Sequence, residues 1–159
     1  MFTKVCSALA VLVASTLGVA GTAHAQSYKL NQALPEDRDT ILQEITIAAD
    51  RVTATILLRN TSKETIEACA HASARPESFS IKDLDTGKVV KQLGSTGLKA
   101  CDQGMDTIKP GARKTLKIEF PGLPATARRL QLGENNCQPK PDDDMDYWCF
   151  AEVVLANKK

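Results

Sequence analysis

The densest group of side chains that could do chemistry is an acidic run near the C-terminus, residues 142–146. Within it, Asp142, Asp144 and Asp146 occupy the first, third and fifth positions, a spacing that lets carboxylates converge on a hard cation such as Ca²⁺. The glycine and the bidentate glutamate of a helix-loop-helix calcium motif are missing from the positions that follow. The pattern therefore favours a solvated acidic loop, and a weak Ca²⁺ site at these three aspartates is the alternative.

Four cysteines follow the N-terminal segment: Cys69, Cys101, Cys137 and Cys149. In an oxidising compartment an even number of cysteines predicts disulfides, here with three possible pairings. We favour Cys69 with Cys101 and Cys137 with Cys149. A zinc site would lack the paired C-x-x-C spacing and would have only His71 to complete it.

The sequence shows no catalytic apparatus. His71 is the only histidine after residue 26, so a Ser-His-Asp triad would have to recruit it. No G-x-S-x-G sequence marks a nucleophilic serine, and a cysteine in a disulfide is not a thiolate. We therefore expect a protein that is not an enzyme and needs no cofactor. The alternative is a hydrolase assembled across loops, with His71 and acidic residues as candidates.

Aromatic residues are few, and three of them gather at Tyr147, Trp148 and Phe150. Facing outward, these rings would form an apolar anchor with a charged rim, which is the composition of a binding hot spot. Facing inward, Trp148 and Phe150 would be the large residues of an otherwise aliphatic core, and the pattern favours this orientation. Tyr147, Trp148 and Phe150 are thus candidate binding residues whose role depends on their orientation.

The N-terminal segment, residues 1–25, has the features of a signal peptide. Lys4 precedes an apolar run from Val5 to Ala20, and Ala23-His24-Ala25 matches the small-x-small cleavage pattern. The run is shorter than the roughly 20 residues that span a bilayer. We therefore expect a periplasmic or secreted product that does not insert into the membrane after cleavage.

Charge excludes one class of partner. The formal net charge of the whole chain is only +1, so no excess of basic residues favours binding to nucleic acid. We expect the partner to be a protein or another component of the cell envelope.

The elements that would position these residues are strands. Residues 26–40 are polar, contain Pro35 and show neither helical nor strand periodicity, so we expect an N-terminal arm. Residues 41–159 are predicted to form a single domain. Hydrophobic alternation with period two predicts strands over 41–49, 51–59, 66–69, 78–84, 89–93, 115–120, 130–132 and 147–155.

Strict alternation also assigns side chains to faces. In the first of these strands it places Ile41, Ile45 and Ile47 on one face and Leu42 on the other. In the last strand it places Trp148 and Phe150 on one face, opposite a set of smaller residues. That set consists of Cys149, Ala151, Val153 and Leu155.

About seven or eight short antiparallel strands separated by turns predict an all-β, two-sheet sandwich of immunoglobulin type. The turn Ile108-Lys109-Pro110-Gly111, the strand that follows it and the run Ile56 to Ser62 resemble parts of bacterial exported immunoglobulin-like domains. This resemblance covers Ile41 to Leu155 and implies a fold rather than an activity. Because Trp148 follows three of the four cysteines, we do not expect the inter-sheet bridge of antibody domains. The function we expect is a non-catalytic exported module that binds a protein or an envelope component.

Overall fold

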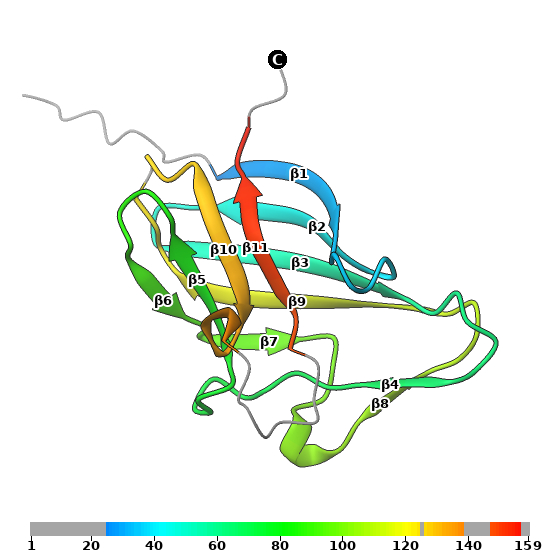
Figure 1. Ribbon diagram of the computed structural model, residues 1–159. Coiled ribbons are helices and arrows are strands. Elements are labelled where there is room, and N and C mark those ends of the chain that lie inside the picture. Colours follow the sequence, from blue (N-terminus) through cyan, green and yellow to red (C-terminus); the bar gives the residue numbers. More distant parts are fainter. Residues whose placement is uncertain (1–24, 125, 139–146, 157–159) are drawn as a thin grey trace, which may run out of the picture.

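The computed structural model describes residues 25–124, 126–138 and 147–156, and these form an all-β sandwich (Figure 1). One sheet contains, in spatial order, β1 (Gln26–Ala33), β2 (Thr40–Ile47), β3 (Arg51–Arg59), β9 (Arg113–Pro121) and β7 (Gly94–Thr96). The other contains β11 (Cys149–Val154), β10 (Arg129–Glu134), β5 (Phe79–Asp83) and β6 (Val89–Lys91). A separate ribbon pairs β4 (Ile66–Ala68) with β8 (Asp106–Ile108), and two single-turn 3-10 helices complete the fold, η1 (Cys101–Gln103) and η2 (Asn135–Cys137).

Every ladder between these strands is antiparallel, and no described segment forms a helix of seven or more residues. The antiparallel sandwich predicted from the alternation is confirmed, with more strands than the seven or eight expected. The additional ones, β1, β7 and β8, are short or largely polar, so their sequences carry little hydrophobic periodicity.

The core lies between the two sheets, whose strands cross steeply (Figure 1). Apolar side chains at alternate positions face inward because successive residues of a strand point to opposite sides of the sheet. From the five-stranded sheet the fully buried residues include Val52, Ala54, Ile56, Leu116, Ile118 and Phe120. From the four-stranded sheet they include Phe79, Ile81, Leu130, Leu132, Phe150 and Val153. Burial of such side chains contributes on the order of 25 cal/mol per Å² of apolar surface.

The interpretation of residues 26–40 as an N-terminal arm is wrong for its first half, because Gln26–Ala33 forms β1 and pairs with β2. Only Tyr28 is fully inside the core, and backbone pairing rather than an apolar face holds the strand. Asn31 has φ 53° and sits in a β-bulge between Lys29 and Gln32. This bulge breaks the period of two, which hid the strand in the sequence.

A second bulge lies on β2 and overturns the assignment of its faces. Leu42 pairs with Ile56, whereas Glu44 pairs with the adjacent Thr55, so one extra residue occupies β2 between them. Leu42 and Ile45 are consequently both fully buried, although strict alternation places them on opposite faces. The extra residue shifts the face of everything beyond it.

A third bulge has the same effect on the last strand. Leu132 pairs with Phe150 and Leu130 with Val153, so two residues of β11 oppose one of β10. Phe150 and Val153 therefore both face the core, and the prediction that they lie on opposite faces is wrong.

The chain passes directly from one sheet to the other after β6. Leu93 N–H donates to the carbonyl of Glu119 at 2.7 Å, which brings the chain alongside β9 just before β7 begins. On the opposite side of the sandwich, the Gln32 side chain donates to the Glu152 carbonyl at 2.9 Å and links β1 to β11. The two sheets are thus connected along both sides.

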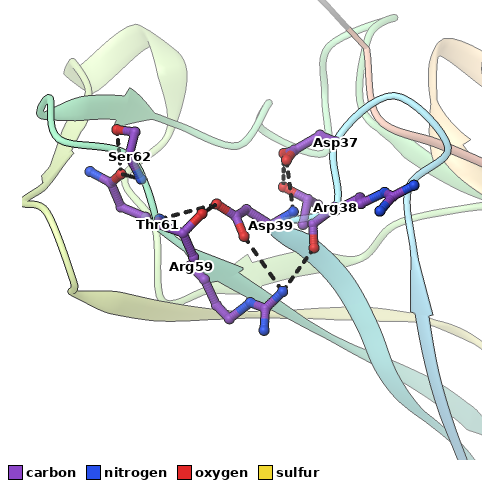
Figure 2. Close-up of polar contacts among 8 residues, drawn as sticks. Asp37, Arg38, Asp39, Arg59, Thr61 and Ser62 are labelled. Atoms are coloured by element: carbon purple, nitrogen blue, oxygen red, sulfur yellow. Dashed lines mark hydrogen bonds and ion pairs between the residues drawn. The ribbon is translucent and has the colours of Figure 1, made fainter.

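A polar network joins the loop before β2 to the segment after β3 (Figure 2). The Asp39 carboxylate accepts hydrogen bonds from the hydroxyl and the backbone N–H of Thr61, and Arg59 lies 3.5 Å away. These two hydrogen bonds, followed by the Arg59 charge, lower the pKa of Asp39 from its ordinary value. Asp39 therefore stays ionised at neutral pH and fixes the two loops against each other.

Next to this network, Asn60 directly follows β3 and has its side chain buried. Its Nδ2 donates to the carbonyls of Glu64 and Ile108 at 2.7 and 2.8 Å, and its Oδ1 accepts from the Ser62 N–H and hydroxyl. A buried amide with both ends satisfied stabilises one conformation of the turn. This Asn-Thr-Ser turn also anchors the β4–β8 ribbon, because Ile108 belongs to β8.

Both favoured disulfide pairings are present: Cys69–Cys101 and Cys137–Cys149. Disulfides of this kind indicate an oxidising compartment. The signal-peptide prediction concerns residues 1–25, almost all of which lie outside the described part. Within that part, no helix has the length and apolar character needed to cross a bilayer.

Replacing Cys69 and Cys101 together by serine should lower the free energy of unfolding by about 4 kcal/mol, because the unfolded chain then regains the freedom of a 32-residue loop. The matching replacement of Cys137 and Cys149, which close a loop of 12 residues, should lower the free energy of unfolding by about 3 kcal/mol. Equilibrium urea denaturation measures both losses. A larger loss for the shorter loop would contradict the loop-closure account.

Candidate functional site

The strongest candidate site is the end of the sandwich where Trp148 lies. Tyr147 and Trp148 directly precede β11, and both are partly exposed. The Trp148 ring packs against Phe79 with centroids 6.1 Å apart, and the Tyr147 ring lies 6.3 Å from that of His71. The group that we call the Trp148 pole also includes two pocket residues beside His71. It consists of His71, Arg75, Asp102, Glu134 to Cys137, Tyr147 and Trp148.

The three aromatic candidates separate into two kinds. Phe150 is fully buried on β11, in the core orientation that the sequence favours, and it cannot form part of a binding surface in this conformation. Trp148 has one side against Phe79 while the rest remains accessible, and Tyr147 lies at the rim with His71. A binding role for Tyr147 and Trp148 stays a prediction.

His71 lines a pocket of about 140 Å³ beside these rings, together with Ala72, Arg75, Cys101 and Asp102. Its Nε2 atom is buried and has no hydrogen-bond partner among the described residues, while its carbonyl accepts from the Gln92 side chain at 2.8 Å. The pocket contains the Arg75 guanidinium and the Asp102 carboxylate, and the Cys69–Cys101 disulfide forms one of its walls. It contains no serine or threonine hydroxyl and no free thiol among its described lining residues, so it offers His71 no nucleophile to activate.

Glu134, at the end of β10, is a site residue that the sequence analysis missed. It is buried, and its carboxylate accepts from the Trp148 N–H at 3.3 Å while its own N–H donates to the Trp148 carbonyl at 3.0 Å. Burial raises the pKa of Glu134 to about 7, and the Trp148 hydrogen bond only partly opposes this effect. No ion pair within the described residues includes it. Glu134 therefore titrates near neutral pH in direct contact with the backbone of Trp148.

The turn after Glu134 is strained. Asn135, Asn136 and Cys137 have φ values of 48°, 53° and 58°. Asparagine visits this left-handed region at modest cost, whereas Cys137 loses about 1–2 kcal/mol there. The Cys137–Cys149 disulfide holds this turn in place. Two hydrogen bonds add to it: the Asn135 N–H donates to the Glu77 carbonyl, and the Ser80 hydroxyl donates to the Asn136 side chain. Strain of this kind tends to gather at functional positions.

Gly133 explains how the turn fits so closely against β11. A Cβ atom at this position would lie 2.5 Å from the Cys137 sulfur and 2.8 Å from the Trp148 carbonyl oxygen. Only glycine allows β10, the disulfide and Trp148 to approach this closely. The sequence signal for this arrangement is the Gly-Glu-Asn-Asn-Cys run, in which glycine and two asparagines favour a tight turn before the cysteine.

The candidate metal ligands Asp142, Asp144 and Asp146 lie outside the described residues. Within the described ranges, no group of three or more histidine, cysteine, aspartate or glutamate side chains could hold a metal ion. The Ca²⁺ alternative therefore stays a prediction about the segment between Cys137 and Cys149.

Comparison with known proteins found no matching family model, no matching curated protein and no matching solved structure. The geometry of this chain is therefore the basis for any functional conclusion.

Replacing Glu134 by glutamine should remove a pH-dependent loss of stability. The pKa is about 7 in the folded state against an ordinary 4.5, so folding favours the protonated form. This contribution is fully present below about pH 4.5 and is lost as the pH rises through 7, a change of about 3 kcal/mol. Glutamine cannot ionise and keeps an oxygen for the Trp148 N–H, so Glu134→Gln should melt at a higher temperature than the parent at pH 8.

Thermal unfolding followed by circular dichroism between pH 4.5 and pH 8 tests this prediction. The matched control is Glu67→Gln, which removes the same charge from an exposed position on β4. The control should track the parent at every pH. An equal pH dependence in Glu134→Gln and the parent would show that Glu134 is not the titrating group.

Proposed function

We propose that this protein is a non-catalytic module, exported from the cytoplasm, that binds a protein partner of the cell envelope through the Trp148 pole. The observation that carries the proposal is the contact between Tyr147 and His71, because it joins the exposed aromatic side chains to the Arg75–Asp102 pocket in one surface. Tryptophan, tyrosine and arginine are the residues most enriched in binding hot spots.

The rigidity of the pole supports a binding role. Cys69–Cys101 forms one wall of the pocket, and Cys137–Cys149 fixes the turn beside Trp148. A surface that is ordered before binding loses less conformational entropy on association, which increases affinity for a given contact area. The two disulfides thus stabilise the parts of the pole that a partner would touch.

The chemistry of the pole favours a protein over a reactive substrate. Its accessible groups are aromatic rings, a guanidinium and a carboxylate, and its described pocket offers no nucleophile. An interface of this composition has an apolar centre and a charged rim of both signs. A partner with an apolar side chain flanked by opposite charges would complement it.

Site-specific photocrosslinking in living cells tests the proposal. A photoreactive phenylalanine analogue at Tyr147 should give a discrete crosslinked product with one envelope protein, whereas the same analogue at Val154 should not. Val154 is the matched control because it is an exposed apolar position, 52% accessible, on β11 outside the pole.

The charge reversal Arg75→Glu should reduce the Tyr147 product by about tenfold, because it places two carboxylates at the rim of the pocket. Crosslinking of equal strength from Tyr147 and Val154, or a product insensitive to Arg75→Glu, would refute binding through the pole. Circular dichroism of each variant establishes that the fold is intact.

A further inference from the structure

A second hollow lies on the outer face of the five-stranded sheet, away from the core. It has a volume of about 230 Å³, and its lining residues come from β3, β7 and β9: Thr53, Gly94, Ser95, Thr96, Lys117 and Glu119. The strand register explains its shape. Thr53, Glu119 and Gly94 lie side by side across three strands, and Lys117 lies beside Thr96 in the next row.

Gly94 creates the depth of this hollow. A Cβ atom added there would meet no other atom within 4 Å, and Gly94 does not have a positive φ. Every other described glycine either has a positive φ or would clash with its surroundings. Glycine within a strand costs roughly 0.5–1 kcal/mol relative to alanine. The fold does not require glycine at this position, so its lack of a side chain is best explained by the space that it leaves open.

The polar groups around this space are available to a ligand. Within the described part of the chain, the side chains of Thr53, Thr96 and Lys117 have no hydrogen-bond or ion-pair partner. Glu119 is paired with Arg51 at 3.0 Å, so these two charges largely cancel. Ser95 lies opposite the buried Ile118, so alternation turns its side chain to the other face of the sheet. The hollow therefore has the two threonine hydroxyl groups and a net positive charge from Lys117.

These features define the ligand by chemistry. No leucine, isoleucine, valine or aromatic side chain lines the hollow, and its apolar surface comes only from the carbon atoms of polar residues and of Gly94. Such a lining suits a ligand that combines a carbon skeleton with several polar groups. The volume is below the roughly 300–1,000 Å³ of pockets that hold drug-sized molecules, and it suits a single ring. A ligand that satisfies both threonine hydroxyls and the lysine carries several hydroxyl groups and one negative charge.

We propose that this hollow binds one acidic sugar residue of a glycan chain. The sugar carboxylate pairs with Lys117, the ring occupies the space above Gly94, and ring hydroxyls exchange hydrogen bonds with Thr53 and Thr96. The hollow opens on the flat outer face, so a longer glycan can continue across the sheet. This site involves none of the residues of the Trp148 pole and does not depend on the function proposed for that pole.

A titration with glucuronate, followed by NMR of the ¹⁵N-labelled protein, tests the proposal. The amide signals of residues in the hollow should shift with a dissociation constant in the millimolar range, as expected for one ring without aromatic stacking. Glucose, which lacks the carboxylate, should bind about tenfold more weakly because it cannot form the charge-assisted contact with Lys117. Signals from the Trp148 pole should not move.

Two substitutions provide the critical comparison. A Cβ atom at Gly94 meets no other atom within 4 Å, so Gly94→Val should fill the hollow and abolish the glucuronate shifts. The higher strand propensity of valine should raise the melting temperature by about 3–5 °C. Lys117→Gln should weaken glucuronate binding about tenfold. The matched control is Lys82→Gln, which removes one exposed lysine from β5 in the opposite sheet and should leave binding unchanged.

Several results would overturn the proposal. The absence of shifts in the hollow at high glucuronate concentration would do so, as would binding that survives Gly94→Val. Equal binding of glucose and glucuronate would show that the hollow does not require a carboxylate on the sugar. Equal binding of acetylglycine would show that the hollow recognises a carboxylate, such as a peptide C-terminus, rather than a sugar.

Discussion

The structure depends on one unbroken ladder, the pairing of β3 with β9. It runs from Arg51 opposite Pro121 to Arg59 opposite Arg113 without a shift in register. Because the register holds throughout, one face of the ladder is apolar apart from Lys114 and buries residues such as Ile56 and Ile118. The other face is polar apart from Leu57 and Pro121. The core is built on the first face, and the hollow at Gly94 is built on the second.

The sequence predicted both strands of this ladder, though not their pairing, because neither strand contains an irregularity. Polar residues alternate strictly with buried ones in the middle of both strands, as Thr53 and Thr55 do in β3 and Lys117 and Glu119 do in β9. A period of two therefore identifies both strands and the face of each side chain. The same reasoning missed β1 entirely and assigned wrong faces in β2 and β11, because an extra residue shifts the alternation in each of these strands. The backbone accommodates such a residue at little cost when a neighbouring strand is bent to match, and a single sequence carries no clear sign of where this happens. The disulfide pairing was predictable because each bridge joins cysteines that follow each other in the chain.

The candidate sites were less predictable than the fold. The sequence singled out Tyr147, Trp148 and His71 as residue types, but only the fold shows that the Tyr147 and His71 rings meet. Glu134 looked like an ordinary polar residue, since its burial depends on Trp148 and the left-handed turn packing over it. No sequence pattern marks Gly94 as a strand residue, because β7 has only three residues and its partner β9 is distant in sequence. Long-range contacts create these sites, and local sequence patterns do not report them.

The bulge in β11 has a consequence for chain length. Because two residues there oppose one residue of β10, removal of Ala151 would leave Phe150 and Val153 still facing inward, now joined by ordinary alternation. A comparable deletion within β3 or β9 would turn every following apolar side chain toward solvent and expose its polar neighbours to the core. Insertions and deletions of a single residue should therefore be tolerated at the bulge of the last strand and eliminated from the central pair during evolution.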